Sequence, residues 1–83
     1  MRPDHMSLTQ SQLITYLRDE QNIGEAIDND TELFSSGILD SVSMVGLITY
    51  IEETTGTIIQ PGDVTLENFD TANRIAAFVA SLA

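Results

Sequence analysis

The apolar residues of this chain recur mainly at the spacing of an α-helix. In the clearest stretch, apolar residues stand at i, i+3, i+4 and i+7, so they share one face of a helix. These residues are Met44, Leu47, Ile48 and Ile51. We expect the helix to run from about Ser41 to Thr55 and to stop at Gly56, after a pair of β-branched threonines.

Another helix is predicted near the start of the chain. Thr9 and Gln12 fit a capping box, and Leu8 and Leu13 occupy the positions of a hydrophobic staple. The helix should therefore begin near Thr9 and end near Gln21. Its apolar stripe consists of Leu13, Ile14 or Tyr16, and Leu17.

The end of the chain predicts a third main helix, beginning around Asp70 or Thr71. Its buried face is marked by apolar residues at helical spacing. These are Ala72, Ile75, Ala76, Val79 and Leu82, with Phe78 beside them. Before this helix, Pro61-Gly62 signals a turn, and the segment 63–69 holds at most a short helix capped by Thr65.

The segments between these helices are predicted to be loops. No period holds from Ile23 to Asp40, so we expect a long loop that scattered apolar residues hold in place. These anchors are Ile27, Leu33, Phe34, Ile38 and Leu39. The segment Thr57–Gln60 is short and has no obvious pairing partner, so it is predicted to be a loop rather than a strand.

Together these elements predict an all-α fold, a small antiparallel bundle of three main helices and one short helix, with a long loop between the first two helices. Residues 7–83 are expected to form a single domain, because the chain has only 83 residues. We interpret residues 1–6, which offer a second possible start at Met6, as a leader or a disordered start.

Composition narrows the range of partners. Thirteen aspartates and glutamates face three arginines, and the net charge of −10 repels nucleic acid and anionic membranes and attracts a basic partner. The chain has no cysteine, which excludes a thiol nucleophile, a disulfide and a thiolate metal site. Because neither an apolar run of membrane-spanning length nor a secretory pattern is visible, we expect a cytoplasmic protein.

The residues give no support for independent catalysis. The only histidine, His5, lies in the predicted leader, so no serine has a convincing base. No serine sits in a Gly-x-Ser-x-Gly elbow. Adjacent carboxylates such as Glu52 and Glu53 point about 100° apart on a helix and are typical of a solvated surface.

A calcium loop beginning at Asp28 is the best metal hypothesis, because oxygen-bearing side chains alternate there. It fails at its sixth and twelfth positions, where Leu33 and Leu39 stand in place of glycine and glutamate. We expect no metal site in the chain and interpret Asp28 and Asp30 as turn formers.

Ser41 is the candidate functional residue. At a helix start its hydroxyl would lie beside unpaired backbone N–H groups and the positive end of the helix dipole, which suit a phosphate ester. The plain alternative is that a helix-opening serine is only a cap. The competing serines are Ser35, Ser36 and Ser43.

The helix predicted after Ser41 carries an unusual stripe opposite its apolar face. The stripe comprises Val42, Gly46, Thr49 and Glu53. Val42 would face water, and Gly46 costs about 1 kcal/mol relative to alanine inside a helix. Either another protein approaches this side closely, or a neighbouring segment of the same domain packs on Gly46.

The segment 33–42 resembles the attachment motif of acyl and peptidyl carrier proteins. It reads Leu33-Phe34-x-x-Gly37-x-x-Asp40-Ser41-Val42, and the resemblance covers essentially residues 9–82. It implies that Ser41 bears 4′-phosphopantetheine, transferred from coenzyme A by a separate, magnesium-dependent phosphopantetheinyl transferase. Asp40 matches the aspartate that helps to hold the metal during transfer.

The same resemblance implies that the thiol of the arm carries cargo as a thioester and that partner enzymes do the chemistry. The stripe of Val42, Gly46, Thr49 and Glu53 coincides with the side that the family offers to its partners. A carrier must present its arm to several active sites in turn, which favours a monomer.

Finer features separate this chain from fatty-acid carriers. Their second helix is strongly acidic, whereas here only Glu52 and Glu53 are charged. The segment 61–71 is similar to freestanding aminoacyl carriers of the D-alanyl and nonribosomal-peptide kind. This implies an amino acid or small acid as cargo, an adenylating ligase as partner, and downstream enzymes that accept the acyl group. The alternative is a small acidic helical interaction module without a prosthetic group.

Overall fold

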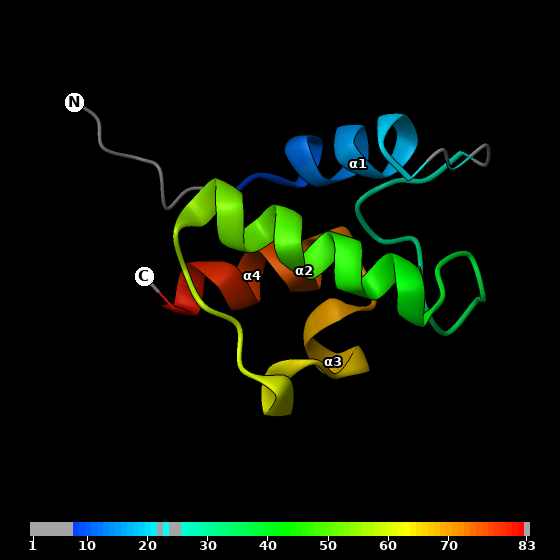
Figure 1. Cartoon of the computed structure of the whole chain (residues 1–83). Helices are drawn as coiled ribbons and strands as arrows, with labels where there is room; N and C mark the ends of the chain where they lie inside the picture. Colours follow the sequence, from blue (N-terminus) through cyan, green and yellow to red (C-terminus); the bar gives the residue numbers. More distant parts are fainter. Residues whose placement is uncertain (1–7, 22, 24–25, 83) are drawn as a thin grey trace.

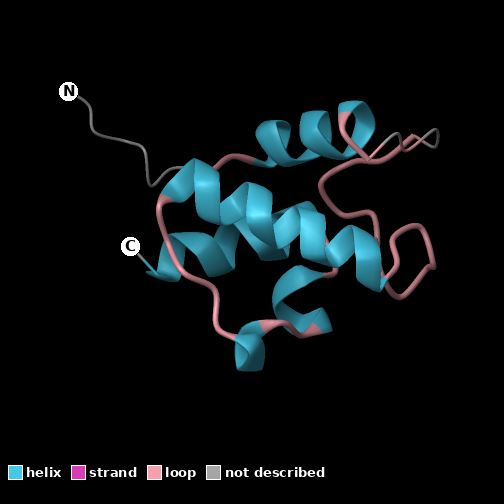
Figure 2. Cartoon of the chain, in the orientation of Figure 1, coloured by secondary structure: helices cyan, strands magenta, loops and turns pink. Residues whose placement is uncertain are grey.

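The computed structural model describes residues 8–21, 23 and 26–82. The helices are α1 (Gln10–Asp19), α2 (Ser41–Thr55), α3 (Leu66–Phe69) and α4 (Ala72–Leu82), and a 3₁₀ turn covers Pro61–Asp63 (Figure 1). These described residues contain no strand (Figure 2). The predicted all-α fold is confirmed, whereas the predicted leader, residues 1–6, lies outside the described ranges.

The three long helices lie side by side but do not all alternate in direction. Figure 1 shows α1 running opposite to both α2 and α4, which run in the same direction. The antiparallel arrangement therefore holds for α1 against the other two. The short α3 lies below them and packs on α4, and α4 also packs on α1.

Side-chain caps fix where the helices begin, as the sequence predicts. Thr9 Oγ1 accepts the N–H of Gln12 at 3.1 Å, and the Gln12 side chain accepts the N–H of Thr9 at 2.8 Å. Thr65 caps α3, and Thr71 Oγ1 accepts a backbone N–H in the first turn of α4 at 3.0 Å. α2 stops at Gly56, whose φ of 74° few other residues adopt.

One apolar core joins all four helices and the loops between them. It comprises Leu8, Leu13, Leu17, Leu33, Leu39, Leu47, Ile51, Ile59, Phe69, Ala72, Ile75 and Val79. Leu33 and Leu39 come from the long loop, so two of its predicted anchors are fully buried and the others are half-buried against the core. Leu33 and Leu39 thus hold the last part of the long loop against the core, next to the start of α2.

The structure differs from the sequence prediction at two helix ends. α1 ends at Asp19 rather than near Gln21. Leu82, predicted on the buried face of α4, lies in its last turn and is 37% exposed, so this face ends at Val79. The predicted loop at 57–60 is confirmed, and it also supplies Ile59 to the core.

Candidate functional site

Ser41 is the first residue of α2 and lies at the end of the helix that the long loop reaches (Figure 1). Its side chain is exposed, and within the described ranges its hydroxyl makes no hydrogen bond. A free hydroxyl at the positive end of a helix dipole can accept a phosphate ester without breaking any native contact. This position meets the steric and electrostatic needs of the predicted attachment site.

The competing serines are already engaged by their neighbours. Ser35 Oγ donates to Asp70 Oδ2 at 2.6 Å, and Ser36 Oγ donates to the carbonyl of Glu32. Ser43 hydrogen-bonds to Asp40. In the described part of the chain these three serines thus have hydrogen-bond partners that the hydroxyl of Ser41 lacks, and attachment at Ser41 stays a prediction.

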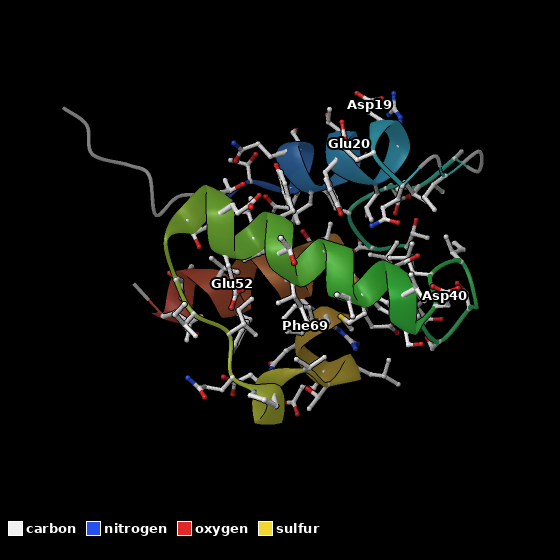
Figure 3. All side chains as sticks on the ribbon, viewed as in Figure 1. Asp19, Glu20, Asp40, Glu52 and Phe69 are labelled. Carbon is white, nitrogen blue, oxygen red and sulfur yellow. The ribbon has the colours of Figure 1, made fainter. Side chains whose placement is uncertain are left out.

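Asp40 is the N-cap of α2, at the right-hand end of this helix in Figure 3. Its Oδ1 accepts the backbone N–H of Ser43 at 2.9 Å. Hydrogen bonds from the backbone and the side chain of Ser43 hold the pKa of Asp40 below its ordinary value. The carboxylate next to Ser41 therefore stays ionised at neutral pH, and an ionised oxygen is a ligand that magnesium prefers.

Gly37 gives the loop before Ser41 its sharp reversal. Its φ is 88°, in the left-handed region, and its N–H donates to the carbonyl of Phe34 at 3.1 Å. The reversal brings Leu39 back to Leu33, where the N–H of Leu39 donates to the carbonyl of Leu33 at 2.8 Å. The glycine of the motif thus has a structural role in leading the chain to Ser41.

Asp70 anchors the same loop from the other side. Its Oδ1 accepts the N–H groups of Phe34 and Ser35 at 2.8 and 3.0 Å, and its backbone carbonyl accepts the N–H of Leu33 at 2.6 Å. Burial raises the pKa of Asp70, but the hydrogen bonds from Ser35 and Phe34 and the charge of Arg74 lower it, and the net pKa is lowered. Sequence reasoning placed Asp70 only at a helix start, because its contact with the loop spans about half the chain.

A groove of about 390 Å³ adjoins Ser41 between the start of α2 and the start of α3. Its walls include Phe34, Met44, Val64 and Leu66, so it is mostly apolar and has Ser41 and Asp40 at its edge. An arm attached to Ser41 would find an apolar surface beside it.

The exposed side of α2 is apolar near Ser41. Val42 is 77% exposed, Val45 is 65% exposed, and Leu66 of α3 is 52% exposed. Sequence reasoning named Val42 but missed Val45 and Leu66. Val45 stands three residues after Val42 and therefore lies near it on the helix surface, and this spacing could have identified Val45 from the sequence.

The predicted stripe on α2 does not form one open surface. Val42, Thr49 and Glu53 are exposed, but Gly46 is half-buried. A Cβ at Gly46 would lie 2.7 Å from Gln21 Nε2 and 3.1 Å from the Tyr16 hydroxyl oxygen. The structure thus shows a neighbouring segment of the same domain packed on Gly46, the second of the alternatives that the sequence left open.

The segment beginning at Asp28, which the sequence analysis rejected as a calcium loop, forms a turn. Asp28 Oδ1 accepts the N–H of Asp30 at 2.9 Å and the hydroxyl of Thr31 at 3.0 Å. These hydrogen bonds hold the pKa of Asp28 below its ordinary value. In the part of the chain that the structure describes, no three histidine, aspartate or glutamate side chains gather closely enough to hold a metal ion.

Comparison with known families identifies the family to which this chain belongs. The family model for the phosphopantetheine attachment site matches residues 11–79. The chain belongs to this family of carrier domains. A carrier of this family holds phosphopantetheine covalently and is not itself an enzyme, which agrees with the exposed Ser41 and with the position of Asp40 beside it.

Curated relatives of this carrier are named D-alanyl carrier proteins. Those of Lactococcus lactis subsp. cremoris (strain MG1363) and Abiotrophia defectiva are 40% and 38% identical to it over 52 residues. Each match covers 63% of this chain and 66% of the relative, just under two thirds of the relative's length.

A similar solved structure is described as "Crystal structure of FAD-dependent dehydrogenase". The matching chain superposes with a TM-score of 0.75 at 31% identity, over 82% of this carrier and 99% of that chain. Within the described residues of this carrier, no helix is long and apolar enough to cross a membrane.

Proposed function

We propose that this carrier holds an aminoacyl group as a thioester on a 4′-phosphopantetheine arm attached to Ser41. The observation that carries the proposal is the free, exposed hydroxyl of Ser41 at the first position of α2, within the segment that the phosphopantetheine attachment family matches. The aminoacyl cargo is supported by the D-alanyl carrier relatives and by the weak acidity of α2.

Incubation with coenzyme A, magnesium and a broad-specificity phosphopantetheinyl transferase tests this proposal. The intact mass of the protein is expected to rise by one phosphopantetheine group, and a second, downstream incubation with an adenylating ligase and its amino acid should add one aminoacyl group. An unchanged mass after the first step would instead favour the small acidic interaction module.

Asp40 is proposed to help hold magnesium while the transferase loads Ser41. Asp40→Asn keeps a side-chain oxygen that can cap α2 but removes the negative charge, so loading should slow by about tenfold or more while helicity is retained. Circular dichroism reports the role of Asp40 as the N-cap of α2, and the initial rate of loading reports its role in holding magnesium. A rate equal to that of the unaltered carrier would show that Asp40 serves only as the N-cap.

Partner enzymes are proposed to dock on the exposed apolar surface of Val42, Val45 and Leu66 beside Ser41, together with Thr49 and Glu53 of the predicted stripe. Val42→Asp should lower the kcat/KM of the transferase about tenfold, because it places a charge in the centre of an apolar contact. Ile58→Asp is the matched control, since Ile58 is 70% exposed but lies beyond the opposite end of α2. Equal losses in the two variants would argue against this docking surface.

The partners proposed are the transferase, an adenylating aminoacyl ligase and downstream enzymes that accept the acyl group, with no nucleic acid and no membrane among them. The similarity to a chain in a structure of an FAD-dependent dehydrogenase supports a flavin-dependent oxidation of the carried group as one downstream step. A monomeric, cytoplasmic carrier suits successive visits to these enzymes.

A further inference from the structure

A second, larger groove lies between α1 and α2, away from the groove beside Ser41. Its volume is about 760 Å³, and it is lined by the polar side of α1 and by Gly46, Thr49 and Glu53 of α2. Tyr16 and Tyr50 also line it, and their rings are stacked with centroids 4.2 Å apart and planes inclined by 13°. The groove therefore offers aromatic surface within an otherwise polar wall.

Both tyrosine rings are held by hydrogen bonds at their hydroxyl groups. Gln21 Nε2 donates to the Tyr16 hydroxyl oxygen at 2.8 Å, and the Tyr50 hydroxyl donates to the backbone carbonyl of Gln12 at 3.4 Å. The absence of a side chain at Gly46 leaves room for Gln21 to make its contact. The aromatic surface is thus preorganised, which lowers the entropy cost of binding to it.

The charged residues of the groove are all acidic. Asp19 and Glu20, at the end of α1 in Figure 3, and Glu53 of α2 line it, and among the residues that the structure describes no lysine or arginine does. The net charge of −10 adds to this local field. A second copy of the chain would bring the same charges together, so the charge favours a cationic occupant over self-association.

We propose that the groove binds an arginine side chain on a surface segment of a partner protein. A guanidinium group can stack on a tyrosine ring and donate paired hydrogen bonds to carboxylates, whereas a lysine ammonium lacks the planar fork. The proposed contact does not involve the phosphopantetheine arm. The proposal rests on the proposed function only in that the partner protein is an enzyme that the carrier visits.

Titration of the ¹⁵N-labelled carrier with a short capped, alanine-rich peptide bearing two arginines four residues apart tests this inference. Amide shifts should change mainly at Tyr16, Asp19, Thr49 and Glu53, and the lysine version of the peptide should bind more weakly. Each carboxylate removed should weaken binding about threefold, so Asp19→Asn combined with Glu53→Gln should weaken it about tenfold.

The matched control is Asp63→Asn combined with Glu67→Gln, which removes the same two charges outside the groove. Equal weakening in the two double variants, shifts spread over the whole acidic surface, or no binding would overturn the proposal. The titration uses the carrier without its arm, and loading with phosphopantetheine is measured separately by the intact mass. A failure of the groove and a failure of the attachment site are therefore seen in different measurements.

Discussion

Ser41→Ala is expected to abolish loading with phosphopantetheine while leaving the fold intact. The change removes a hydroxyl that is exposed and makes no hydrogen bond among the described residues, so the free energy of unfolding should change by about 0.5 kcal/mol or less. The loss of loading should be complete, because the bond to the arm forms at this oxygen. Intact mass and urea denaturation are measured on the same sample.

Ser43→Ala is the matched control for this substitution. Ser43 lies in the same first turn of α2, but its side chain interacts with Asp40. Its removal should lower stability slightly and leave the final extent of loading unchanged. Loading that persists in Ser41→Ala and disappears in Ser43→Ala would move the attachment site to Ser43.

Asp70→Ala is expected to lower the free energy of unfolding by about 3 kcal/mol. It leaves the partly buried N–H groups of Phe34 and Ser35 without their acceptor, and hydrogen bonds to a charged group contribute about 1.5–3 kcal/mol each before allowance for partial exposure. Glu67→Ala, on the exposed side of α3, should change the free energy of unfolding by about 0.5 kcal/mol or less. Equal effects of the two substitutions in urea denaturation would show that Asp70 does not anchor the loop.

The pH dependence of stability gives an independent measure of the same anchor. Because the pKa of Asp70 is lowered in the folded state, its carboxylate stabilises the fold at pH values above the ordinary aspartate pKa of 3.8. This stabilisation is lost as the pH falls from there through the folded-state pKa. Asp70→Asn should therefore show a smaller loss of stability in this acidic range than the unaltered carrier.

The parts of the fold that local chemistry determines could be predicted from the sequence. The bounds of α2 follow from Asp40, Gly56 and the apolar spacing between them, and the capping box at Thr9 sets the start of α1. The motif also placed Ser41 at the helix start. These features depend on residues within one or two turns of each other, so the chain order contains the information.

The features that were missed depend on contacts between distant segments. Asp70 lies 36 positions after Phe34 and 35 positions after Ser35, the loop residues that it holds. Gln21, just after α1, packs on Gly46 of α2. In α4, apolar residues at helical spacing continue to Leu82, although the buried face of the helix ends at Val79. Periodicity predicts which face of a helix is apolar, but not how far a neighbouring segment extends to cover it.

The most direct test of the carrier assignment is to map the modified residue in the loaded, unaltered protein. Fragmentation of the peptide that spans residues 35–43 should place a single phosphopantetheine on Ser41, with Ser35, Ser36 and Ser43 unmodified. Phosphopantetheine on any other serine, or none after complete incubation with the transferase, would contradict the account.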